Sequence, residues 1–154
     1  MNKPLSWDKL LLFHRNSYIG NIGRSAFIKN KYTIFKHLLN KRLGISNTEY
    51  IKNTILKSND QYILTNNDFP YDLDNCVAHL ILWINSYNKN NDWITSSVEL
   101  NNLNYFQEIV KRELIQKYKH TKLNNKSIKY IYFENSEKNR SIPGIRHIHI
   151  FVLK

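Results

Sequence analysis

The sequence predicts an α+β protein in which helices come first and a mostly antiparallel sheet follows. Apolar residues recur at helical spacing through residues 1–58, and the pattern then changes to short runs rich in β-branched and aromatic residues over 59–154. One long amphipathic segment near 97–119 interrupts those runs. Helices followed by strands favour an α+β fold, because parallel sheets need strands and helices that alternate.

The size and composition are those of one domain. A chain of 154 residues can bury a substantial core, and 42% of its residues are hydrophobic. The sequence contains no internal repeat and no linker rich in Pro, Gly or Ser. We therefore expect a single domain over 1–154, with a helical part at 1–58 and a sheet with one long helix at 59–154.

Three helices are expected in the N-terminal part because each has a start signal. Ser6 can cap a helix that begins at Trp7, Ser25 can cap a longer helix that ends before Gly44, and 46–49 is a capping box for the third. The second helix has an apolar stripe, which we expect to face the core. Its members are Phe27, Ile28, Phe35, Leu38, Leu39 and Leu43.

Four strands are expected in the second part, at 61–65, 77–84, 127–134 and 147–153. The strand at 77–84 is apolar on both faces, which is typical of a central strand. Turn-forming residues at 66–71 separate the first two strands, and a polar loop at 85–92 follows the second. A second capping box, at 96–99, opens the long helix.

The chain is strongly basic, with 23 Lys and Arg against 12 Asp and Glu and a formal net charge of +11. Such a charge attracts polyanions, including RNA, DNA and phosphorylated ligands. A richness in Asn, Lys, Ile and Tyr, which is typical of AT-rich genomes, explains the same charge without a function. The two explanations stay open at this point.

The sequence favours a cytoplasmic protein with no membrane partner. Cys76 is the only cysteine, so an internal disulfide is excluded and a reducing compartment is expected. No apolar run has the length of a signal peptide or of a transmembrane helix, and neither a lipidation signal nor a basic amphipathic anchor is evident.

The residues with the clearest chemical potential lie on the last strand. Side chains alternate across a strand, so His147, His149 and Phe151 share one face while Ile148 and Ile150 share the other. Imidazole titrates near neutral pH and can act as a nucleophile or general acid in phosphoryl transfer. The pair could instead be structural, on an exposed sheet face. A metal site would need a third ligand that the spacing does not supply, so we expect neither a metal nor a cofactor.

The loop before this strand is rich in hydrogen-bond donors that could hold a phosphate. It contains Asn135, Arg140, Ser141 and Arg146, and Glu137 is its only acid.

Four further residues are candidates, each with a plain structural alternative. Asp68 could accept hydrogen bonds from a ribose or simply form a turn, and His79 could act in catalysis or be a satisfied core histidine. Trp83 could stack on a base or fill the core. Arg24, at a helix start, could bind an anion, although Ser25 as a plain N-cap explains that segment as well.

Several of these segments together resemble the fungal N-acetylglucosamine-induced protein family, whose function is unknown. The segments that carry the resemblance, in order, are 6–8, 23–25 with Tyr32, 67–71, 78–83, 133–135 and 141–149. The resemblance spans nearly the whole chain and implies a link to nucleotide-sugar or amino-sugar metabolism.

A more distant resemblance is to the histidine-triad superfamily of nucleotide hydrolases and transferases. The matching positions are 69–71, His79, the helix near 97–119, Asn135, Ser141, His147 and His149. This resemblance implies that His149 is the nucleophile, that His147 orients it, and that Asn135 and Ser141 hold the phosphate. The third position of the triad is Phe151, and the gap between Ser141 and His147 is about three residues longer than that superfamily has.

These observations favour a protein that binds a nucleotide or nucleotide sugar at a histidine-triad-like phosphate site and is catalytically impaired. The first alternative is an active nucleotidyl hydrolase or transferase with His149 as nucleophile. The second alternative is a basic protein that binds RNA or DNA.

Overall fold

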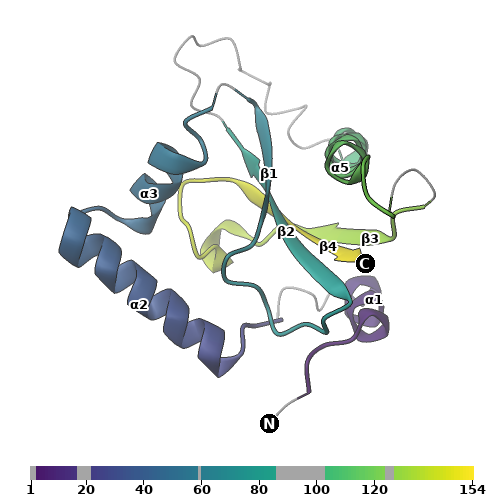
Figure 1. Cartoon of the computed structure of the whole chain (residues 1–154), viewed down its shortest axis with the longest axis horizontal. Helices are drawn as coiled ribbons and strands as arrows, with labels where there is room; N and C mark the ends of the chain where they lie inside the picture. The colour runs from purple at the N-terminus through teal and green to yellow at the C-terminus, as the bar shows by residue number, and fades with distance from the viewer. Residues whose placement is uncertain (1–2, 17–21, 59, 86–102, 124–126) are drawn as a thin grey trace.

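The computed structural model describes residues 3–16, 22–58, 60–85, 103–123 and 127–154, and it confirms the α+β class. Three helices precede the sheet and a fourth packs on it (Figure 1). The helices are α1 (Trp7–Arg15), α2 (Ala26–Leu43), α3 (Asn47–Thr54) and α5 (Leu103–Tyr118), and the strands are β1 (Tyr62–Asn66), β2 (Val77–Ile84), β3 (Tyr130–Phe133) and β4 (His147–Leu153). Most of the expected loop at 85–92, the capping box at 96–99 and the start of the long helix lie outside the described residues.

The helix starts follow the sequence signals. Oγ of Ser25 accepts a hydrogen bond from the backbone N–H of Ile28 at 3.3 Å, and Ser46 and Glu49 form the expected capping box. Oγ of Ser6 caps α1 in the same way. Gly44 ends α2 with φ of 64°, a left-handed conformation that favours glycine.

The four strands form an open antiparallel sheet in the order β1-β2-β4-β3. The central place of β2 confirms the interpretation of its apolar pattern. The register pairs Ile81 with His149 and Trp83 with His147. The third strand, Tyr130–Phe133, is shorter than the expected 127–134. Ser127 cannot belong to an extended strand, because its φ is 68°.

The sheet has two buried faces. On one face, Leu82 and Ile150 pack with their neighbours against Val110 and Leu114 of α5. The other face has two separate apolar clusters: one around Trp83 and Ile51 next to α3, and one around Phe151 and Leu10 next to α1.

Histidines occupy the gap between those two clusters. His79, His147 and His149 are each at most 6% exposed. Because β4 is an interior strand and this face is covered, the alternative of an exposed histidine pair is wrong.

The apolar stripe expected to bury α2 is only partly buried. Leu39 is 6% exposed, as expected, but Phe27 is 65% exposed, Leu38 38% and Leu43 63%. The helix lies at the periphery of the described part of the molecule, whose other elements lie to one side of it (Figure 1). Only one side of the helix is buried, and that side is too narrow to hold all six residues of the stripe. The remaining residues therefore face outward.

No described helix combines the length and the hydropathy that crossing a membrane requires.

Candidate functional site

A chain of hydrogen bonds joins β2 to β4 through two histidines. Nε2 of His79 lies 3.0 Å from Nδ1 of His149, and the backbone N–H of Tyr71 donates to Nδ1 of His79 at 3.1 Å. The turn at 66–71 positions that amide over the imidazole, and the Tyr71 ring packs on both histidine rings at 4.6 and 5.3 Å. Residues that are far apart in the sequence thus meet on one sheet face.

The backbone amide of Tyr71 determines the direction of this chain. A backbone N–H cannot turn, so Nδ1 of His79 must accept and a neutral His79 carries its proton on Nε2. That proton is donated to Nδ1 of His149, which places the proton of a neutral His149 on its own Nε2.

The next partner in the chain is the side-chain amide of Asn135. Its Nδ2 lies 3.1 Å from Nε2 of His149 and 3.5 Å from the hydroxyl of Tyr71. The N–H of His149 and the NH₂ of Asn135 cannot donate to each other. A 180° rotation of the Asn135 side-chain amide exchanges the positions of its oxygen and nitrogen. The direction of the chain therefore requires the Asn135 oxygen to face His149, where it can also accept from Tyr71. Both ring nitrogens of His149 are then occupied.

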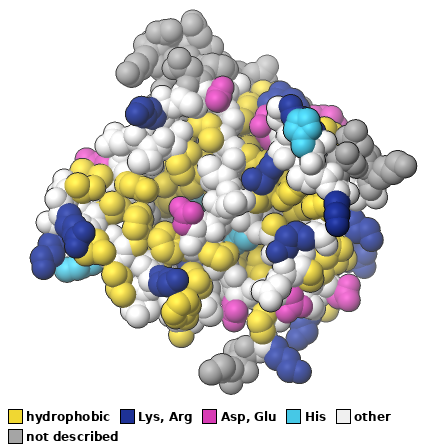
Figure 2. Space-filling model, in the orientation of Figure 1, with side chains coloured by type: hydrophobic (Ala, Val, Ile, Leu, Met, Phe, Trp, Pro, Cys, Tyr) yellow, Lys and Arg dark blue, Asp and Glu magenta, His cyan; other side chains and the backbone are white. Residues whose placement is uncertain are grey.

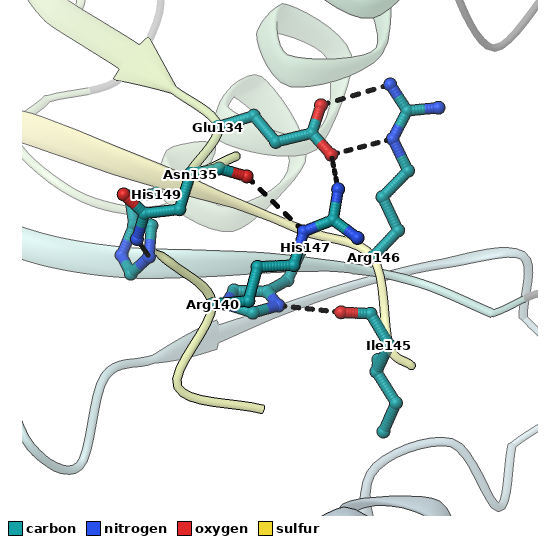
Figure 3. A network of polar contacts seen from close by, with 7 residues as sticks. All are labelled: Glu134, Asn135, Arg140, Ile145, Arg146, His147 and His149. Atoms are coloured by element: carbon teal, nitrogen blue, oxygen red, sulfur yellow. Dashed lines mark hydrogen bonds and ion pairs between the residues drawn. The ribbon is translucent and has the colours of Figure 1, made fainter. Parts of the chain in front are cut away.

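His147 is held differently. Its Nδ1 lies 2.9 Å from the carbonyl oxygen of Ile145, which can only accept, so Nδ1 carries the proton and Nε2 carries a free lone pair (Figure 3). No described group bonds that Nε2. Because no buried polar side-chain atom of the described residues lacks a partner, Nε2 of His147 is not fully buried. His147 also lines a pocket beside the sheet.

Burial keeps all three imidazoles neutral. Desolvation, with smaller contributions from His147 and Arg24, lowers the pKa of His149 to about 3. Burial also lowers the pKa of His79 well below its usual range, with His149 and Arg24 adding to the effect. The pKa of His147 is lowered by burial, although its bond to the Ile145 carbonyl opposes the shift.

A pocket opens over His147 and His149. The sheet forms its floor, and α2, α3 and residues 65–69 form its walls. Its aromatic lining consists of Tyr32, Phe35, Tyr50, Phe69 and Trp83. A partly aromatic lining of this kind suits an organic ligand with a flat ring.

Four of the candidate residues line the same pocket: Arg24, Asp68, Trp83 and Ser141. The guanidinium of Arg24 donates through Nε to the Phe69 carbonyl at 2.8 Å and lies over the Tyr32 ring at 4.7 Å. These two contacts hold the cation at the pocket wall. Asp68 and Ser141 are exposed at the rim, whereas Trp83 is buried and donates to Thr65.

Two candidate phosphate ligands have another partner. Glu134 binds Arg146 through two hydrogen bonds of 2.8 and 3.0 Å, and it binds Arg140 at 2.8 Å (Figure 3). Neither arginine lines the pocket. Arg140 also donates to the carbonyl of Asn135 at 3.3 Å, so this ion-pair cluster holds the start of the loop beside His149.

Three residues of the site were not among the candidates from the sequence: Tyr71, Asn67 and Glu134. Oδ1 of Asn67 accepts from the Phe69 amide, and its Nδ2 lies 3.2 Å from the His79 ring. Both Asn67 and Tyr71 belong to the turn that precedes the strand of His79. Their place in that turn was a signal in the sequence that could have identified them as site residues. Glu134 lies one residue before the loop in which acids were counted.

Within the described residues, no cluster of His, Cys, Asp or Glu has the arrangement of a metal site. His79 and His149 point one nitrogen each at the other, and their remaining nitrogens are hydrogen-bonded to protein groups.

The fold and this buried polar chain define an α+β protein with a histidine-based pocket on one face of an antiparallel sheet. The chain belongs to the family of proteins of unknown function DUF3605, whose pattern matches residues 21–153. It is also similar to the crystal structure of HTC1, with a TM-score of 0.61 and 15% identity over 97% of this chain and 85% of that chain. At that identity the similarity shows a shared fold. A comparison with curated proteins found no match.

Proposed function

We propose that the pocket binds a phosphorylated small molecule, either a nucleotide or a nucleotide sugar. One observation carries the proposal: Arg24 and His147 line the same hollow as a set of aromatic rings. The terminal nitrogens of Arg24 have no described partner, so they are free to bind phosphate oxygens in the bidentate manner typical of arginine.

The aromatic wall supports a ligand with a base. Phe69 packs on Tyr32 at 4.9 Å and on Phe35 at 5.1 Å, which gives a preformed surface for stacking. Asp68 at the rim can accept hydrogen bonds from sugar hydroxyls. The resemblance to the N-acetylglucosamine-induced proteins is consistent with a nucleotide sugar.

Phe151 favours binding over turnover. It fills the position of the third histidine in the histidine-triad resemblance, and it is fully buried against the rings of His79 and Phe133. A phenyl ring cannot donate a proton to a leaving group. The free, exposed thiol of Cys76 fits a reducing compartment, and we propose the cytoplasm.

The unpaired Nε2 of His147 supports nucleotidyl transfer or hydrolysis as a second candidate function. Its lone pair could attack phosphorus to form an N–P bond while the bond to the leaving oxygen breaks, and water would then cleave the N–P bond. Because both nitrogens of His149 have partners, the structure favours His147 over His149 as this nucleophile.

Calorimetric titration against AMP, UMP, UDP-N-acetylglucosamine, a dinucleoside polyphosphate and a short RNA tests the proposal. We expect one phosphorylated small molecule to bind and Arg24→Gln to weaken it about tenfold, near 1.4 kcal/mol. Arg112→Gln, at an exposed position of α5, is the matched control and should leave the affinity for the ligand unchanged.

Incubation of the bound ligand with the protein then separates the two candidates. Turnover that is lost in His147→Gln would establish the enzyme, whereas an unchanged ligand supports a binding protein. Binding of RNA alone, with affinity that falls steeply as salt rises, would replace both with the basic nucleic-acid-binding alternative.

A further inference from the structure

Helix α2 presents a second surface, about a right angle around the helix from the side that lines the pocket. We call it the outer stripe, and it consists of Phe27, Lys31, Ile34, Leu38, Lys41 and Arg42. Its apolar members Phe27, Ile34 and Leu38 are 65%, 50% and 38% exposed. Helical geometry of 3.6 residues per turn places these three side chains within about 20° of one line along the helix.

Cations flank that line on both sides. On the same helical wheel, Lys31 and Arg42 fall on one side of it and Lys41 falls on the other. Residues 26–43 include five Lys and Arg and no acid. None of the five is in a salt bridge with a described residue, since the described salt bridges use Arg112, Arg140 and Arg146.

Basic and apolar side chains lie next to each other on the surface over α2 (Figure 2). Over the position of α2, at the left of the view, Lys and Arg side chains alternate with hydrophobic ones (Figure 2). The stripe runs about 22 Å along the helix at 1.5 Å per residue. Nζ of Lys31 lies 4.6 Å from the Phe27 ring centre, so the charged and apolar groups are interleaved and not segregated.

We propose that the outer stripe of α2 docks on an anionic lipid surface, with Phe27, Ile34 and Leu38 entering the headgroup region. A helix with a line of apolar side chains flanked by lysines is suited to lie in a membrane interface, where long basic side chains reach the anionic headgroups. The absence of acids on α2 makes the charge complementary to such lipids.

Lipid fits the outer stripe better than nucleic acid does. Phosphate backbones would neutralise the cations but leave Ile34 and Leu38 in water, whereas an acyl interface buries them. The sequence did not indicate this surface because its apolar pattern on α2 included Phe27 and Leu38 in the core stripe. The structure distinguishes the buried Leu39 from the exposed Phe27 and Leu38.

Co-sedimentation with vesicles of phosphatidylcholine, alone or in an equimolar mixture with phosphatidylserine, tests the inference. The full chain should bind the anionic vesicles at least tenfold more tightly than the neutral ones. Ile34→Gln with Leu38→Gln should weaken that binding about tenfold, because the inserted apolar area is lost. Leu12→Gln with Ile115→Gln removes two exposed apolar side chains from α1 and α5, and it should not weaken binding.

A second pair of variants tests whether the position of the positive charges matters, since both variants remove the same number of charges. Lys31→Gln, Lys41→Gln and Arg42→Gln together should weaken binding strongly. Lys111→Gln and Lys117→Gln on α5, with Lys119→Gln just after it, remove the same charge and should weaken binding little. Equal losses in the two triple variants would overturn the inference in favour of general attraction by the +11 charge. So would a failure to bind anionic vesicles, or binding that Ile34→Gln with Leu38→Gln leaves unchanged.

Discussion

Lowering the pH from 7 to 5 should reduce the free energy of unfolding by about 2 kcal/mol through His149 alone. Its pKa is about 3 in the folded protein and near 6.5 in the unfolded chain. Between those values the unfolded state binds more protons, so stability is full above pH 6.5 and falls by about 1.4 kcal/mol for each pH unit below it. The lowered pKa values of His79 and His147 change stability in the same direction.

Urea unfolding at pH 7, 6 and 5 measures this effect. His149→Gln should reduce the slope of stability against pH, because it removes one of the titrating groups. A wild-type stability that is flat from pH 7 to 5 would mean that the imidazoles are not buried as described.

Replacing His79 by Ala should destabilise the protein by about 3–4 kcal/mol. The change opens a cavity under Tyr71, and it leaves the Tyr71 amide and Nδ1 of His149 without partners. His120→Ala, at an exposed position after α5, is the matched control and should cost less than about 0.5 kcal/mol. Urea unfolding at pH 7.5 avoids the titration effect.

His79→Leu separates the cavity from the hydrogen bonds. Leucine restores most of the volume but neither bond, so we expect it to recover less than half of the loss caused by Ala. A His79→Leu variant as stable as the wild type would show that the polar chain contributes nothing to stability.

The fold was predictable because the signals behind it are local. Ser25, Gly44 and the capping box at Ser46 mark helix ends through bonds within a few residues. Periodicity also identified β2 as central. Periodicity cannot say which side of a helix has a neighbour, and for that reason the burial of Phe27 and Leu38 was expected wrongly.

The site was only partly predictable because its chemistry depends on contacts across the sheet. His147, His149 and the turn at 66–71 are conspicuous in the sequence. The pairing of β2 with β4 brings His79 to His149, and nothing local specifies that pairing. The roles of the two nitrogens of His149 follow from a backbone amide 78 residues away, at Tyr71. Similarly, Glu134 forms ion pairs with Arg140 and Arg146, which the sequence alone predicts to be phosphate ligands.

The direction of the hydrogen-bond chain decides which histidine can act on a ligand. If the proton of His149 is on Nε2, that nitrogen is committed to Asn135 and the free lone pair belongs to His147. If the chain ran the other way, the Tyr71 amide would face an N–H of His79, an arrangement without a hydrogen bond.

The most direct test of the direction of the hydrogen-bond chain is to determine the tautomers of the three histidines. Two-bond ¹H–¹⁵N correlation spectra of the imidazole rings at pH 7.5 measure them. We expect neutral rings throughout, with the proton on Nε2 in His79 and His149 and on Nδ1 in His147. Addition of a phosphorylated ligand that binds should shift Nε2 of His147 more than any nitrogen of His79. A proton on Nδ1 of His149, or an imidazolium at any of the three positions, would contradict the polar chain and the assignment of His147 to the ligand.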